Sequence, residues 1–269
     1  MKNRLTLLIA LFIVSLVTFS SATFAWFTEQ LHPEVGNLTF NVATQEHLMI
    51  STTGKKGEFE DELSFNELYS NDDVTLKPLK GSVSDNAILL KNTNDTIANK
   101  NDYIQFPLYF SSSTDMDVYL DSKSDKIINI VKNADSIFKD EDINKIVDSL
   151  RIGFLVYNTV KIDNGPNVDT TYTPVDTLVY SENEKTNESY KDVTTGKPYE
   201  TFTSLRYTND SDRDVVLFST KANEVKKIDV FIWLESQDKS CEVKIFDAKL
   251  TIEMVFFGNQ IVEGGASEE

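Results

Sequence analysis

The alternation that decides the fold class runs through Tyr103-Ile104-Gln105-Phe106-Pro107-Leu108-Tyr109-Phe110. The even-numbered positions of this stretch are all large and apolar. They fall on one face of an extended chain, because successive side chains of a strand point to opposite sides. The stretch therefore predicts a β-strand with one buried face.

Segments of the same character, rich in β-branched and aromatic residues, recur on both sides of it and are also predicted strands. They are Leu38–Val42, His47–Ser51, Met116–Leu120, Arg151–Tyr157, Val215–Ser219, Lys227–Glu235 and Ala248–Phe257. A polar stretch separates the last two, which we expect to pair as antiparallel neighbours at the centre of a sheet. Many short strands and no fixed-period repeat predict an all-β fold, a jelly-roll-like antiparallel β-sandwich.

Residues 125–150 break the alternation, because their apolar side chains recur at spacings of three and four. This spacing predicts a short helical excursion, made of two short helices that cover one end or edge of the sheets. Asp140 or Asp142 is the expected N-terminal cap of the second helix.

Two polar, turn-rich segments interrupt the strands, at about residues 71–101 and 158–214. We interpret both as insertions and expect only weak hairpins in the second. The rest of residues 26–269 is predicted to form a single β-sandwich domain around one core.

The N-terminus has the pattern of a secretory signal peptide over residues 1–25. Lys2 and Arg4 precede a long uncharged, apolar run, and small residues follow it. Cleavage by a signal peptidase is expected between Ala25 and Trp26, which predicts a secreted or cell-surface protein without stable membrane insertion after cleavage. The alternative is a retained signal anchor, because the apolar run is long enough to span a bilayer.

Composition excludes some classes of partner. The 269 residues carry a formal net charge of -17, which opposes binding to the phosphates of nucleic acid or to anionic lipid. The single cysteine, Cys241, cannot close an intramolecular disulfide. We expect it to be a small, partly buried residue near a strand turn.

The sequence offers no catalytic residues and no cofactor motif. The two histidines, His32 and His47, lack the one-turn spacing of a zinc peptidase, and no Gly-x-Ser-x-Gly elbow or glycine-rich phosphate loop is present. We therefore predict a protein that is not an enzyme.

Calcium is the one ion for which the sequence holds a partial pattern. Asp210, Asp212 and Asp214 have the spacing of the first three ligands of an EF-hand, but Val215 and Lys221 stand where that loop needs glycine and a bidentate acid. A loose Ca²⁺ site remains a prediction for these aspartates. The alternative set of ligands is Asp115, Asp117 and Asp121.

Both ends of the mature chain resemble one family. The segments Thr23–Thr28 and Val35–Val42, together with Val230–Cys241, resemble the TasA/camelysin-like secreted proteins of Gram-positive bacteria. The last segment is similar to a Trp-Leu-Glu-Gly-x-Asp-x-x-Cys pattern, with Ser236 in place of the glycine. The resemblance implies cleavage by a SipW-type signal peptidase.

The resemblance also implies a jelly-roll matrix or surface protein that self-assembles into fibres by donor-strand exchange, as in a biofilm. The donor would be the segment Trp26–Val42, which pairs with an open sheet edge of the next subunit. Its apolar contacts would come from Trp26, Phe27, Leu31, Leu38, Phe40 and Val42.

Three alternatives stay open. The N-terminal strand can instead fold into its own sandwich. The protein can be a calcium-stabilised adhesion module whose segment 158–214 contacts a partner. A metallopeptidase activity of the camelysin type is the third, although the residues offer no histidine pair for it.

Overall fold

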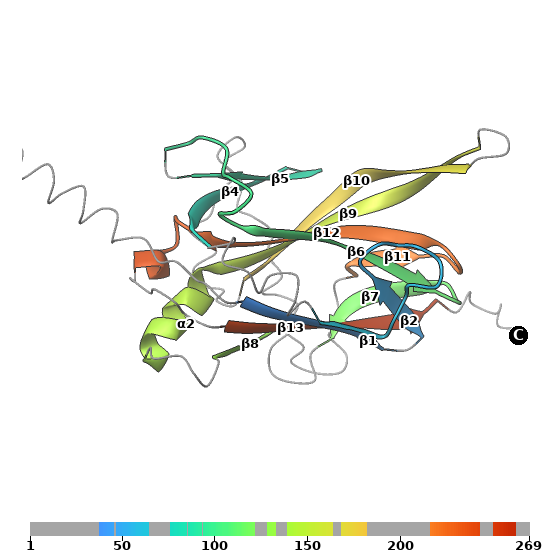
Figure 1. Ribbon diagram of the computed structural model, residues 1–269, viewed down its shortest axis with the longest axis horizontal. Coiled ribbons are helices and arrows are strands. Elements are labelled where there is room, and N and C mark those ends of the chain that lie inside the picture. Colours follow the sequence, from blue (N-terminus) through green and yellow to red (C-terminus); the bar gives the residue numbers. More distant parts are fainter. Residues whose placement is uncertain are drawn as a thin grey trace, which may run out of the picture.

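The computed structural model describes residues 38–45, 47–64, 76–84, 86–92, 94–121, 128–132, 139–163, 168–181, 216–242 and 250–261. These residues form an all-β sandwich in which two sheets face each other (Figure 1). We name the two sheets after their central strands, the β13 sheet and the β12 sheet. Most strand pairs in both are antiparallel.

The β13 sheet has the order β11-β7-β13-β1-β3, and β8 also pairs with β13. On one side of β13, strands β8 and β7 pair with successive halves of it; on the other side lies β1. The strands are β1 (Leu38–Gln45), β3 (Glu62–Ser64), β7 (Met116–Asp121), β8 (Ile128–Lys132), β11 (Phe218–Thr220) and β13 (Leu250–Gln260).

In the β12 sheet, β12 lies between β9 and β6, with β10 beyond β9 and β2 beyond β6. Strand β4 pairs with the end of β12 and carries β5 beside it. The strands are β2 (Leu48–Ser51), β4 (Pro78–Ser84), β5 (Ala87–Lys91), β6 (Ile104–Ser112), β9 (Leu150–Asp163), β10 (Val168–Ser181) and β12 (Val225–Glu235).

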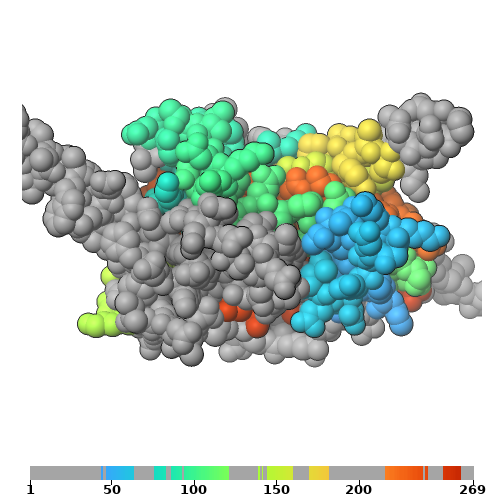
Figure 2. Space-filling view, viewed as in Figure 1, coloured from blue at the N-terminus to red at the C-terminus, as the bar shows by residue number. Residues whose placement is uncertain are grey.

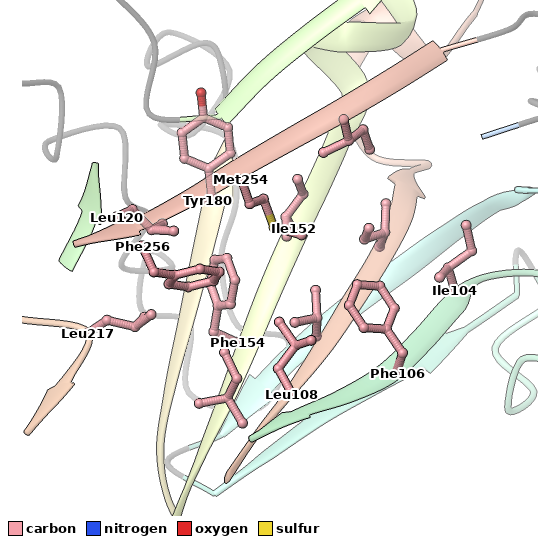
Figure 3. Packing of buried hydrophobic residues seen from close by; sticks show 14 of the residues in the cluster. Ile104, Phe106, Leu108, Leu120, Ile152, Phe154, Tyr180, Leu217, Met254 and Phe256 are labelled. Atoms are coloured by element: carbon pink, nitrogen blue, oxygen red, sulfur yellow. The ribbon is translucent and has the colours of Figure 1, made fainter. Parts of the chain in front are cut away.

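The main core lies between the two sheets, where apolar side chains from both inner faces meet (Figure 3). Phe256 of β13 is central to it. Its ring centroid lies 4.9 Å from that of Phe110 in β6, at an interplanar angle of 64°, and 6.5 Å from that of Phe154 in β9, at 87°. Such edge-to-face contacts add to the free energy gained by removing apolar area from water.

A smaller third layer covers part of the outer face of the β12 sheet. The β4–β5 hairpin packs there over a second apolar cluster that includes Trp233 and Phe231 (Figure 1). Gly153 of β9 permits this approach, because a Cβ at that position would lie 2.5 Å from Ile88 Cδ1 and 3.1 Å from the Trp233 ring. Part of the outer face of the β12 sheet is therefore buried beneath this hairpin and forms a second, smaller core.

The prediction of an all-β sandwich is confirmed. A strand lies in the described part of every predicted strand segment, although β11 begins only at Phe218. Val215, Ala248 and Lys249 lie outside the described residues. The prediction that Lys227–Glu235 and Ala248–Phe257 pair is wrong: they belong to β12 and β13, in different sheets. A 3-10 helix, η2 (Lys239–Glu242), follows β12. β12 and β13 are nevertheless each central in their own sheet, as their apolar character indicates.

The helical excursion is confirmed only in its second half. Helix α2 spans Asp140–Ser149 and lies at one end of the sandwich (Figure 1). In the first half a helix is wrong at residues 128–132, because Ile128–Lys132 form β8, which pairs with β13. The rest of that half, residues 125–127 and 133–138, lies outside the described residues. The expected Asp140 or Asp142 cap is also wrong: the N-cap is Lys139, without a side-chain cap bond. Asp140 and Asp142 lie within the first turn of the helix and not at its N-cap.

The two polar segments interpreted as insertions each contain a hairpin. β9 and β10 pair along their whole length, with an irregularity between Pro174 and Asp176. β4 and β5 pair within the earlier segment. Polar side chains on the outer face of a long hairpin weaken the apolar signal, so these strands are hard to detect in sequence.

Candidate functional site: the first strand and its slot

The first described strand lies in a slot between two other strands of its own chain. β1 pairs in parallel with β13 over all its length, from Leu38 opposite Leu250 to Gln45 opposite Phe257. On its other edge, residues 41–43 pair antiparallel with β3. We call the space between β13 and β3 that β1 fills the β1 slot.

The β1–β13 pair is the only parallel pair of the β13 sheet within the part of the chain described. A parallel neighbour cannot be made by a hairpin, so a long stretch of chain must return before the pair forms. The position of β1 therefore depends on main-chain hydrogen bonds and side-chain register, not on a local turn.

The connection from β1 to β2 is short and conformationally unusual. Only Glu46 and His47 separate the two strands, although β2 belongs to the other sheet. His47 has φ of 62°, a left-handed conformation that costs a non-glycine residue roughly 1–2 kcal/mol. Thr44 Oγ1 donates to the carbonyls of Leu48 and Asp61, at 2.8 and 3.2 Å, and so fixes the start of this turn.

Three of the predicted donor-strand residues lie in β1. Leu38, Phe40 and Val42 stand opposite Leu250, Ile252 and Met254 of the same chain. The arrangement matches the alternative in which the N-terminal strand folds into its own sandwich. The cleavage positions Ala25 and Trp26, and the donor residues Phe27 and Leu31, lie outside the described residues.

The Trp-Leu-Glu segment that carries the resemblance has a structural role at the end of β12. Glu235 accepts hydrogen bonds from Trp233 Nε1 at 3.0 Å, from the Gly81 amide at 2.9 Å and from the Gln237 amide at 3.2 Å. Its carboxylate therefore ties β12 to β4. Gly81 permits the contact, since a Cβ there would lie 2.8 Å from the Trp233 ring.

A buried ion pair fixes the turn that follows. Arg151 Nη2 of β9 donates to Asp238 Oδ2 at 2.7 Å, with 2% and 0% of the two side chains exposed. Asp238 Oδ1 also accepts from the Ser240 amide at 2.8 Å. Cys241, which was predicted to be partly buried, is buried, and burial raises the pKa of its thiol to about 12. The thiol is therefore protonated and poorly nucleophilic at neutral pH.

Glu235 makes the stability of the fold depend on pH. Burial raises the pKa of its carboxyl from 4.5 to about 7, against the opposing effect of its three N–H donors. Between these values the folded state holds a proton that the unfolded state lacks, so the free energy of unfolding falls as pH rises. At pH 4.5 we expect the protonation of Glu235 to add about 2–3 kcal/mol to the free energy of unfolding, and this contribution is lost above pH 7.

Urea unfolding of the parent and of Glu235→Gln from pH 4.5 to 8 measures this contribution. Titration of other groups affects both proteins alike, so the difference between their unfolding free energies isolates Glu235. The parent should gain stability relative to the variant as the pH falls. A difference that stays constant with pH would contradict the assignment.

The predicted calcium ligands do not form a group in the part of the chain that the structure describes. Asp115 Oδ2 binds the Lys221 ammonium at 2.6 Å, and Asp117 Oδ1 accepts from the Ser219 hydroxyl at 2.6 Å. The hydrogen bond from Lys221 lowers the pKa of Asp115. Asp210, Asp212 and Asp214 lie outside the described residues.

The described residues hold no group of three side chains suited to a metal ion. His47 is exposed in the β1–β2 turn, whereas His32 lies outside the described part. Among the same residues, no helix is both long and apolar enough to cross a membrane.

Comparisons with models of known protein families, with curated proteins and with solved structures find no match to this chain. The class that the described residues define is that of the all-β sandwich. Sequence reasoning located β1 as a candidate strand but missed the conformation of His47, which it placed at the start of the next strand.

Proposed function

We propose that this chain is a secreted or cell-surface structural protein that assembles into fibres by exchanging its N-terminal strand between subunits. The observation that carries the proposal is the placement of β1. It is the first described strand, paired in parallel with β13 and antiparallel with β3, and a two-residue connection joins it to β2. The export pattern of residues 1–25 and the resemblance to TasA/camelysin-like proteins support it.

Exchange conserves the contacts that hold β1. The same eight residues of β1 can fill the β1 slot of a second molecule with the same register, so the paired state changes little in energy. The connection does change, because residues 46–47 can extend when β1 leaves its own sandwich. Short, strained hinges favour such swapping, and His47 is strained in the closed form.

The other long edge is less suited to assembly. β10 ends the order of described strands in the β12 sheet, but it carries Pro174 and an irregularity of register beside it. Both features weaken edge-to-edge pairing. Strand exchange at the β1 slot therefore agrees better with the described edges than does simple stacking of sheets.

A disulfide between β1 and β13 tests the proposal. Asn41 pairs with Glu253 in the parallel register, so Asn41→Cys and Glu253→Cys place two thiols on neighbouring strands. Cys241→Ala in the same chain removes the native thiol. In protein that lacks residues 1–25, we expect oxidation of the monomer to lock β1 in place and to abolish fibre formation in light scattering and electron microscopy.

The reduced protein is the matched control and should assemble like the parent. If fibres of the reduced protein are then oxidised, the new disulfides should join different chains and give ladders on a non-reducing gel. Disulfides found only within single chains in assembled material would contradict strand exchange. A mature chain that stays monomeric under all conditions would contradict the assembly function itself.

A further inference from the structure

The outer face of the β12 sheet has a hollow beside the β4–β5 hairpin. Its volume is about 400 Å³, within the range of ~300–1,000 Å³ of small-ligand sites. One wall is formed by the outward side chains of β6 and of the residue before it, Tyr103, Gln105, Pro107 and Tyr109. Lys227 and Asp229 of β12 form the floor, and Lys100 lies at the rim. We name this space the tyrosine hollow.

The tyrosine hollow brings together parts of the chain that are distant in sequence. In the register of the sheet, Lys227 stands between Tyr109 of β6 and Tyr157 of β9. Tyr172 of β10 joins them, with its ring 5.8 Å from that of Tyr109 at an angle of 66°. Figure 2 shows the corresponding segments, coloured green, orange and yellow, adjoining on one face of the molecule.

The aromatic rings are held in place before any ligand binds. Tyr103 stacks on Phe231, with centroids 6.3 Å apart and planes 17° apart. Tyr109 packs against Gly54, where a Cβ would lie only 2.7 Å from Cδ1 of the ring. Both rings are half-buried, so one part of each is fixed by packing while another part lines the hollow. Fixed rings lose little entropy on binding a ligand.

The charged groups on the floor of the hollow, Lys227 and Asp229, form a neutral pair, and Lys100 at the rim adds one positive charge. The Lys227 ammonium lies 3.0 Å from Asp229 Oδ1, and Asp229 Oδ2 accepts from the Tyr157 hydroxyl at 2.6 Å. Burial, reinforced by this bond, raises the pKa of Tyr157, so its hydroxyl remains a donor at all ordinary pH values. Donors and acceptors therefore lie side by side on the floor.

This chemistry selects the class of ligand. The ring faces that could bind a cationic ligand are already occupied by Lys227. Its ammonium lies 4.2 Å from the centre of the Tyr157 ring and 5.9 Å from that of Tyr172. An anionic ligand meets the carboxylate of Asp229. A neutral molecule with an apolar face for the rings, and hydroxyls that both donate and accept, fits both the walls and the floor.

We propose that the tyrosine hollow binds the pyranose rings of a neutral polysaccharide. The C–H face of the sugar packs on Tyr109 or Tyr103, and its hydroxyls hydrogen-bond to Lys227, Asp229 and Gln105. The site is separate from the β1 slot, so the inference goes beyond the proposed assembly. An open hollow of this kind gives weak binding per site, with dissociation constants on the order of millimolar.

Affinity gel electrophoresis of protein lacking residues 1–25 tests this proposal. The probes are four neutral soluble polysaccharides, a β-glucan, a galactomannan, a xylan and dextran, with acidic alginate as a fifth. We expect at least one neutral polymer to retard the protein. Tyr109→Ala should weaken that retardation at least tenfold, whereas Tyr109→Phe should keep most of it.

Two further variants separate binding from folding. Gln105→Ala changes an exposed side chain of the hollow and should weaken retardation severalfold with an unchanged melting temperature. Tyr119→Ala, on β7 of the other sheet, is the matched control and should bind like the parent. Retardation by alginate alone, by no polymer, or equally in the parent and in a folded Tyr109→Ala variant would overturn the proposal.

Discussion

Replacement of Asp238 by asparagine is expected to lower the free energy of unfolding by about 3–5 kcal/mol, as measured by urea denaturation. The change leaves the guanidinium of Arg151 buried without its counter-charge, since only 2% of that side chain is exposed. A lone charge in the interior loses its hydration without an equivalent partner. The effect should appear as a lower denaturation midpoint with an unchanged slope.

A double-mutant cycle with Arg151→Met separates this pair from other contacts. We expect the two single changes to be non-additive by about 2 kcal/mol, since each removes the partner of the other. Asp95→Asn is the surface control: Asp95 accepts from Lys80 at a similar distance of 2.9 Å but is exposed, so its loss should have little measurable effect. Additive single variants would show that the ion pair does not hold the turn.

The second large effect is expected from Phe256→Ala. Phe256 has no exposed area and contacts two aromatic rings of the opposite sheet, Phe110 in β6 and Phe154 in β9. Figure 3 shows it beside Phe154. Removing its ring leaves a cavity between the sheets, which should cost about 3–5 kcal/mol in thermal or urea unfolding.

Phe257→Ala is the matched control for that substitution. The side chain of Phe257 is chemically identical but lies on the opposite face of β13 and is half-exposed. It should therefore lose less stability than Phe256→Ala. Equal losses at the two positions would contradict the assignment of the core to the face that Phe256 shares with Ile252 and Met254.

The sequence predicts the strands of this fold better than their partners. Alternation of apolar residues along β6 depends on local geometry and is visible in the chain itself. The partners of β12 and β13 depend on which faces must be buried together, and proximity in sequence suggested the wrong pair. The first of the two helices predicted within residues 125–150 failed at residues 128–132 for the same reason, because pairing with the edge of β13 determines the structure of β8.

The apolar alternation of β6 predicts the role of its inner face but not that of its outer face. Tyr103, Gln105, Pro107 and Tyr109 alternate with the apolar positions and have their own pattern of aromatic and polar residues. Their convergence with Lys227, however, depends on the register between β6 and β12, which no local pattern gives. The same holds for Glu235, whose three donors come from two separate strands and a turn.

The pairing of β1 with β13 joins nearly the first and nearly the last described residues. Contacts of such high contact order form late, because a long loop must close before they give any free energy. During synthesis β1 leaves the ribosome before the other described strands, but it lacks its main partner until β13 has also been made. The completed sandwich is therefore available only to a chain that extends through β13, and shorter nascent chains contain β1 without the strand that it pairs with.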